Sequence, residues 1–183
     1  MRTRGGLVLV GLLLGLWPAG ASAEQGRAVI ENRRGAAPML LGIASLTDTQ
    51  EGLQVRVDVM GVPPGKHGLH IHEYGDCSDG GDAAGGHLNP DGAPHGFLPS
   101  DGLVGAHPGD MGNIEIGLDG SGTLTVLLPQ VTLSGGSYSV AGRAIVLHQG
   151  PDDFSQPTGN AGSRFGCGVI MLTAPPAAEE PAL

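Results

Sequence analysis

All seven histidines of this 183-residue sequence lie between positions 67 and 148. Two of them, His70 and His72, are separated by a single residue. On a β-strand they point to the same face, so both imidazoles can occupy equatorial positions around one metal ion. A further imidazole, His148, ends an apolar run and is followed by the acidic pair Asp152-Asp153. Coordination by imidazoles alone favours copper, which stands at the top of the affinity series of divalent metals.

A second set of metal-binding residues lies between these positions, on a segment that we expect to be a loop. It consists of His87, His95 and the tetrapeptide His107-Pro108-Gly109-Asp110. Three imidazoles and one carboxylate, with no position left open, suit a structural tetrahedral zinc site. A lone histidine is more often a hydrogen-bonded surface or core residue than a ligand, but six in this arrangement argue against that reading.

The elements that must position these residues are strands, indicated by alternating apolar and polar residues. The clearest case is 53–59, where leucine and valines alternate with Gln54, Arg56 and Asp58. Further strands are expected over residues 27–31, 42–47, 114–117, 123–128, 143–148 and 168–172. With 34 glycines and 14 prolines in the chain, the pattern predicts an all-β antiparallel sandwich or flattened barrel of seven or eight strands, without helices.

Two long connections, 73–113 and 149–164, separate these strands. Loops of this length in a compact domain are usually functional or disordered. The ligands on the first loop favour a functional role.

The first 23 residues have the pattern of a cleaved signal peptide. Arg2 and Arg4 precede an apolar run over 7–17, and Ala21-Ser22-Ala23 supplies the small residues at a cleavage site. The run is short for a bilayer span, although an uncleaved membrane anchor is the alternative. We therefore expect an exported protein, periplasmic or secreted, whose domain covers 24–172. The Pro-, Ala- and Glu-rich stretch 173–183 is predicted to be disordered.

The charge balance excludes some partners. The whole chain carries nine basic and 18 acidic residues, and losing Arg2 and Arg4 would raise the net charge from −9 to −11. Such a protein should not bind nucleic acid, nor anionic membranes once the N-terminal segment is removed.

Only two cysteines, Cys77 and Cys167, are present. In an oxidising compartment one intramolecular pairing is possible, and two separate buried thiols are the alternative.

Two motifs resemble those of copper–zinc superoxide dismutases, in particular of the exported bacterial type. The segment 64–77, PGKHGLHIHEYGDC, resembles the first copper motif of that family, and 158–170, TGNAGSRFGCGVI, resembles its C-terminal signature. The likeness extends over residues 27–172. It implies a Greek-key barrel of about eight strands with two long functional loops.

The resemblance also implies a role for each candidate residue. His87 would bridge copper to zinc, Asp152 would orient one ligand of each metal, and Arg164 would receive the superoxide anion, with Thr158 lining the channel. His67 would be structural, and Cys77 and Cys167 would form an intrasubunit disulfide. The implied ligands are His70, His72, His87 and His148 for copper, and His87, His95, His107 and Asp110 for zinc.

The implied activity is dismutation of superoxide to dioxygen and hydrogen peroxide by a copper redox cycle, with a structural zinc. We expect a homodimer, with a monomer as the alternative. An exported copper-binding or copper-transfer protein on the same fold is the rival function, but it predicts a missing bridge histidine or arginine. A binuclear zinc hydrolase would need more carboxylates, and a blue-copper carrier a cysteine ligand.

One departure from the family concerns the segment 153–158. It is short and lacks the charged residues that steer substrate in many relatives. We therefore expect weak electrostatic steering.

Overall fold

The computed structural model of the chain describes residues 23–173. The predicted signal peptide therefore lies outside the described residues except for Ala23, and the predicted tail lies outside them except for Thr173. Within the described range, no helix is both long and apolar enough to cross a membrane.

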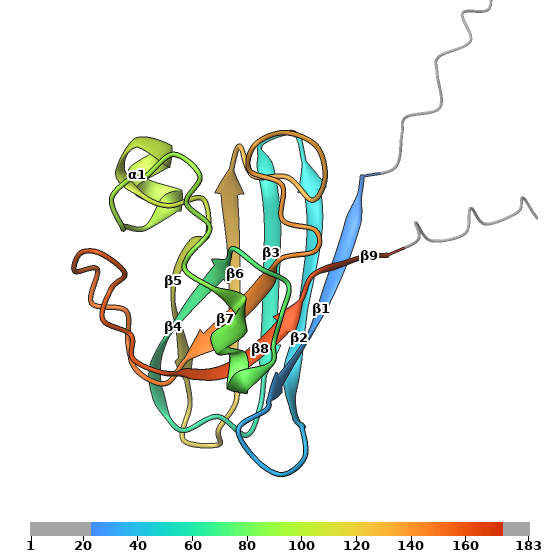
Figure 1. Cartoon of the computed structure of the whole chain (residues 1–183), viewed down its shortest axis with the longest axis vertical. Coiled ribbons are helices and arrows are strands. Elements are labelled where there is room, and N and C mark those ends of the chain that lie inside the picture. The colour runs from blue at the N-terminus through green and yellow to red at the C-terminus, as the bar shows by residue number, and fades with distance from the viewer. Residues whose placement is uncertain (1–22, 174–183) are drawn as a thin grey trace, which may run out of the picture.

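Eight antiparallel strands form a nearly closed barrel, as the sequence predicts (Figure 1). Their order in the sheet is β5-β4-β7-β8-β1-β2-β3-β6, and β5 and β6 lie next to each other where the barrel closes. Consecutive strands of these eight are neighbours in the sheet except at two steps, from β3 to β4 and from β6 to β7. These two crossings give the Greek-key order. The strands are β1 (Gln25–Asn32), β2 (Met39–Thr49), β3 (Gly52–Val59), β4 (Gly65–His72), β5 (Asp110–Ile116), β6 (Gly122–Pro129), β7 (Ala144–His148) and β8 (Arg164–Val169).

The strand pattern is clearest in β3, where the predicted alternation is confirmed. Leu53, Val55 and Val57 are fully buried, whereas Arg56 and Asp58 are exposed and form an ion pair of 2.7 Å on the outer face. The inward side chains of β3 join one apolar core with those of the other strands. Burying this face is the main favourable contribution to the fold.

β4 departs from this alternation because both of its faces are covered. Leu69 and Ile71 point into the apolar core, whereas His70 and His72 point to the other face and are also buried. Its neighbour β7 is buried along its whole length, with His70 opposite Val146 and His72 opposite Ala144. The outer face of this strand pair must therefore be covered by the long loops.

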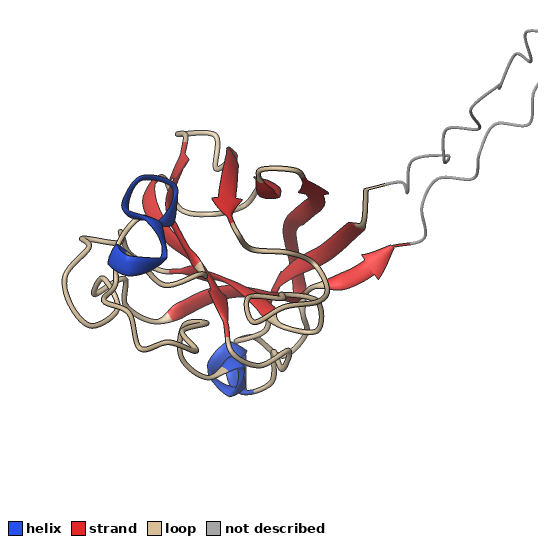
Figure 2. Cartoon of the chain, turned by 90° about the horizontal axis from the view of Figure 1, so that it is seen from above, coloured by secondary structure: helices blue, strands red, loops and turns tan. Residues whose placement is uncertain are grey.

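Two short helices lie in the first long loop, where the sequence analysis expected none. They are η1 (Asp79–Ala84), a 3-10 helix, and α1 (Leu98–Gly105), and both lie outside the barrel wall (Figure 2). α1 begins with a proline in its first turn, and the Asp101 carboxylate accepts a hydrogen bond of 2.8 Å from the Phe97 N–H. Proline and an acid in the first turn favour a helix start, but Gly102 has a φ of 62° and interrupts the helix. The segment is thus too short to show helical periodicity.

The predicted C-terminal strand is divided in two. β8 ends at Val169, and β9 (Met171–Thr173) pairs with β1 instead of β7. Thr173 lies opposite Gln25, so the sheet extends one residue beyond the predicted end of the domain at 172.

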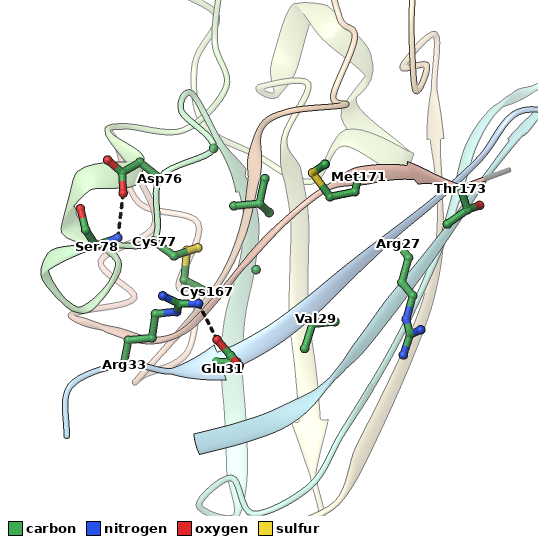
Figure 3. A pocket seen from close by; sticks show the side chains of 13 residues that line it. Arg27, Val29, Glu31, Arg33, Asp76, Cys77, Ser78, Cys167, Met171 and Thr173 are labelled. Carbon is green, nitrogen blue, oxygen red and sulfur yellow. Dashed lines mark hydrogen bonds and ion pairs between the residues drawn. A yellow bond between two sulfur atoms is a disulfide. The ribbon is translucent and has the colours of Figure 1, made fainter. Parts of the chain in front are cut away.

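The predicted disulfide between Cys77 and Cys167 is confirmed. It joins the loop that follows β4 to β8, across 90 residues of sequence. A hollow of about 680 Å³ lies beside it on the outer face of β1, β8 and β9 (Figure 3). None of the predicted metal ligands lines this hollow, so it is separate from the histidine cluster.

The disulfide should contribute strongly to stability. Replacing both Cys77 and Cys167 by serine should lower the free energy of unfolding by about 4–5 kcal/mol, because the unfolded chain regains the freedom of a long closed loop. Urea unfolding of the metal-free oxidised protein and the double variant measures this difference. Equal midpoints would contradict the prediction.

Candidate metal centre

Four imidazoles converge between β4, β7 and the first loop. They belong to His70, His72, His87 and His148, and all four are buried. Each ring can offer one nitrogen to a metal ion, and these four nitrogens lie within 4.8 Å of one another. The Nε2 atoms of His72 and His148 are 3.3 Å apart. The structure therefore brings together all four residues that the sequence analysis predicted for copper.

The second group consists of His87, His95, His107 and Asp110, again with ligand atoms within 4.8 Å of one another. Asp110 lies at its middle: its Oδ1 is 3.1 Å from His87 Nδ1 and 3.2 Å from His107 Nδ1, and its Oδ2 is 2.9 Å from His95 Nδ1. Asp110 Oδ2 also accepts hydrogen bonds from the main-chain N–H groups of Gly96 and His107, each of 3.0 Å. These are the four residues that the sequence analysis predicted for zinc.

His87 belongs to both groups, and its position depends on the sheet. Although His87 lies on the first loop, it forms an isolated β-bridge with His72. The main chain on either side is also bonded to β4, through Leu88 N to Ile71 O at 2.8 Å and Glu73 N to Gly86 O at 2.9 Å. Its Nδ1 faces Asp110, so its Nε2 remains for the four-histidine group.

Hydrogen bonds select which nitrogen each ring presents. His72 Nδ1 lies 2.9 Å from Gly85 O and His148 Nδ1 lies 3.1 Å from Gly162 O, so both present Nε2. His70 is reversed, because its Nε2 contacts Asp152 Oδ2 at 2.8 Å. The two backbone carbonyls were not predicted, since the residue type does not reveal the direction of a carbonyl group.

Asp152 connects the two groups, in the position that the sequence analysis assigned to it. Its Oδ1 lies 2.9 Å from His95 Nε2, while its Oδ2 contacts His70. Each histidine therefore presents its Nδ1 to its own group. Carboxylates that orient metal-binding histidines in this way fix the tautomer and the ring direction.

Two buried nitrogens test whether the residues fit metal ions. His70 Nδ1 and His95 Nδ1 have no hydrogen-bond partner among the described residues, although Asp110 Oδ2 lies close to the latter. A buried polar atom without a partner is unfavourable, and a cation at each group would satisfy both nitrogens. An all-imidazole group and a His₃Asp group fit copper and zinc, respectively.

The protonation states agree with this fit. Burial lowers the pKa of His70 to about 3, that of His72 to about 2 and that of His148 to about 4, so these rings are neutral. For His95, burial is outweighed by the neighbouring carboxylates of Asp110 and Asp152, which raise its pKa to about 9. Neutral imidazole is the form that binds metals, and a divalent cation would replace the proton on His95.

His67 is separate from both groups, as predicted. Its Nδ1 lies 2.9 Å from His148 O and its Nε2 lies 2.9 Å from Pro63 O, so neither nitrogen is available to a metal. It instead holds the main chain at the end of β7.

Arg164 lies beside the four-histidine group because of strand pairing. A β-bulge after Leu147 places His148 opposite Arg164 in the β7–β8 register. The Arg164 guanidinium donates hydrogen bonds to the carbonyl oxygens of Gly81, Asp82 and Gly85, in and just after η1. Burial lowers its pKa, but the group remains a cation.

Arg34 was not predicted as part of this region. Its Nε donates a hydrogen bond of 2.7 Å to the Arg164 carbonyl oxygen, and its Nη2 lies 3.7 Å from Asp82 Oδ1. It comes from the connection between β1 and β2, and no sequence pattern indicates that this turn reaches Arg164.

A cavity of about 340 Å³ joins the arginine to the histidines. It is lined by His72, Gly86, His87, His148, Thr158, Asn160, Ala161, Gly162 and Arg164. Thr158, which the sequence analysis placed at the channel, is therefore among the lining residues. Arg164 is the lining residue with a permanent charge.

A family model and a curated protein that match this chain both describe copper/zinc superoxide dismutases. A family model for copper/zinc superoxide dismutase matches residues 40–170. The chain is 46% identical over 121 residues to the Cu-Zn superoxide dismutase 2 of Brassica juncea, a match that covers 62% of this chain and 77% of that protein.

Solved structures with the same fold include the clock protein EA4 and a SOD-like protein from Bacillus subtilis. The EA4 structure is 35% identical, with a TM-score of 0.70 and coverage of 83% of this chain and 96% of that one. The Bacillus subtilis structure is 31% identical, with a TM-score of 0.67 and coverage of 78% and 95%.

Metal analysis tests the two groups separately. Mass spectrometry of the loaded protein should find about one copper and one zinc per chain, because residues 23–173 form one four-histidine group and one His₃Asp group. Asp110→Asn should lose most of its zinc on dialysis, since the substitution removes the anionic ligand, while copper is retained. Asp119→Asn, in an exposed hairpin turn, serves as the control. Full zinc retention by Asp110→Asn would contradict the assignment.

Proposed function

The chain belongs to the copper/zinc superoxide dismutase family, and we propose that it catalyses the dismutation of superoxide. Two superoxide anions and two protons give one dioxygen and one hydrogen peroxide. The observation that carries this proposal is the shared cavity: the cation of Arg164 and three imidazoles of the four-histidine group line the same space.

Arg164 is suited to receive a small anion. A guanidinium has five N–H donors in a fixed plane. The carbonyl oxygens of Gly81, Asp82 and Gly85 occupy only some of them and hold the plane in place. Arg164 Nε lies 3.6 Å from Asp82 Oδ1, and the second N–H of Nη2 can bind an anion beside His148. A pre-oriented cation of this kind stabilises developing negative charge without reorganisation.

The residues that would hold the metals are those of the two groups. Copper, held by His70, His72, His87 and His148, would supply one-electron redox chemistry. Zinc, held by His87, His95, His107 and Asp110, would have a structural role. His87 Nε2, directed at the four-histidine group, is the atom at which the chain can hold a proton for the reduced product. Asp152 keeps one ligand of each group oriented.

A copper-binding or copper-transfer role is the alternative. The solved structures of similar fold include one described as a clock protein and one described as SOD-like, so the fold alone does not imply turnover. Full metal loading without dismutase activity would favour this alternative. The presence of Arg164 in the cavity favours the enzyme.

Export and assembly extend the proposal. We infer that residues 1–23 are removed, that the mature chain starts near Glu24 in the periplasm or outside the cell, and that it forms a homodimer. The N-terminal residue of the purified mature protein tests the cleavage, and its mass in solution tests the homodimer.

The role of Arg164 can be tested by substitution. Arg164→Ala should lower the second-order rate constant for superoxide by about 10-fold or more, because the anion loses its permanent positive partner. Arg164→Lys should be intermediate, since a lysine keeps the charge and loses the planar fork. Pulse radiolysis of the copper- and zinc-loaded proteins measures this constant. Arg56→Ala, on the exposed face of β3, is the control, and an Arg164→Ala rate equal to it would reject the proposal.

The effect of salt tests the expected weak steering. Thr158 and Asn160 line the cavity without charge, and the loop between Asp153 and Thr158 adds none. Between about 10 and 150 mM salt, the rate constant should therefore fall by less than about twofold, although screening shortens the Debye length over this range. A steep fall would contradict the expected weak steering.

A further inference from the structure

The two long loops meet at the zinc-type group without forming a sheet. Residues 86–109, here called the ligand loop, carry His87, His95 and His107, and residues 149–163, here called the closing loop, carry Asp152. Among the residues that the structure describes, no main-chain to main-chain hydrogen bond joins these two loops. Side chains must therefore set the distance between them.

Gln156 on the closing loop makes the connection to the main chain of His95. Its Oε1 accepts a hydrogen bond of 2.9 Å from the His95 N–H, and its Nε2 donates one of 2.8 Å to the His95 carbonyl oxygen. One primary amide thus forms the donor–acceptor pair that a neighbouring strand would form in a sheet. The contact spans 61 residues of sequence.

Other groups of the closing loop act on the same histidine. Asp152 Oδ1 lies 2.9 Å from His95 Nε2. The centroids of the Phe154 and His95 rings are 6.3 Å apart, and the two ring planes are nearly parallel, at an angle of 18°. Asn113, on β5, holds the main chain of Asp152 with a similar pair of hydrogen bonds, of 2.7 and 2.9 Å. The closing loop therefore holds both the main chain and the Nε2 edge of His95, with the Phe154 ring lying nearly parallel to its imidazole.

We propose that Gln156 is a positioning residue that sets the zinc affinity of the His87, His95, His107 and Asp110 group. This inference rests on the proposed metal assignment. With the main chain of His95 held by Gln156, its ring contacts Asp110 on one side and Asp152 on the other, each at 2.9 Å. Without Gln156, His95 loses partners for its main-chain N–H and C=O, and the ligand loop can move away from Asp152.

The chemistry of the amide explains why glutamine is required. Glutamine offers one acceptor and one donor, which match the His95 N–H and C=O groups. A glutamate of the same size keeps the acceptor but presents its second oxygen to the His95 carbonyl oxygen, which is repulsive. Gln156→Glu therefore separates the hydrogen-bond pattern from side-chain size, whereas Gln156→Ala removes both.

Zinc and copper affinities, measured by competition with chelators on the oxidised protein, test the proposal. In Gln156→Glu and Gln156→Ala, zinc should bind about 10–100-fold more weakly, as is typical when an outer residue that orients a ligand is lost. Copper at the four-histidine group should change by less than about threefold, because Gln156 contacts none of its ligands. Gln54→Ala, an exposed glutamine on β3, is the control and should alter neither affinity.

The visible spectrum of the cobalt-substituted zinc-type group gives a second measurement. The ligand-field bands should shift or weaken in Gln156→Glu but not in Gln54→Ala, because only the former alters the position of His95. Zinc affinity within threefold of the unsubstituted protein would overturn the proposal. An equal loss of copper and zinc affinity would also overturn it, because it would indicate only a general structural role. Neither measurement requires dismutase activity, so a failure of the proposed enzymatic function is recognised separately, in the unsubstituted protein.

Discussion

The burial of many ligand groups in one place is the constraint on which the rest of this structure depends. Six imidazoles and two carboxylates lie together under the two long loops, almost inaccessible to solvent. Such burial is unfavourable unless every polar atom has a partner. Here carboxylate and carbonyl oxygens contact one nitrogen of most of the imidazole rings. The other nitrogens face one another in the two metal-binding groups. The loops therefore have two tasks, to exclude water and to supply those partners.

The barrel supplies the fixed half of this arrangement. Strands β4 and β7 lie side by side, so His70, His72 and His148 are positioned by main-chain ladders that do not involve metal. The register of β7 with β8 adds Arg164, and the disulfide at Cys167 ties β8 to the loop whose carbonyl oxygens hold the guanidinium. A shift of one residue in either register would move these side chains to the opposite face.

The loops supply the adjustable half. Apart from the short bridge between His87 and β4, their irregular main chain makes few hydrogen bonds to the barrel, and side chains take over this role. Asp152 joins the two groups and Gln156 holds the main chain of His95, while Asp110 and Asn113 on β5 hold three histidines and the main chain of Asp152. Removing a partner here leaves another buried polar group unsatisfied, which explains why each contact matters more than its single hydrogen bond. The predicted difference between copper and zinc affinities follows from this division between barrel and loops.

The sequence by itself determined the residue types of the site, most of the strands and the disulfide partners, because ligand chemistry, alternating hydrophobicity and family motifs are local. His70 and His72 could be assigned to one face from their spacing on an assumed strand, and the strand over 53–59 from its alternation. Other features required the tertiary structure: the short helix at 98–105, the reach of Arg34 to Arg164, and the hydrogen bonds of Gln156 to His95. These are contacts between distant segments, and nothing local distinguishes Gln156 from an exposed glutamine such as Gln54. Which polar group meets which is decided by the path of the main chain, and that path is fixed only when the barrel has formed.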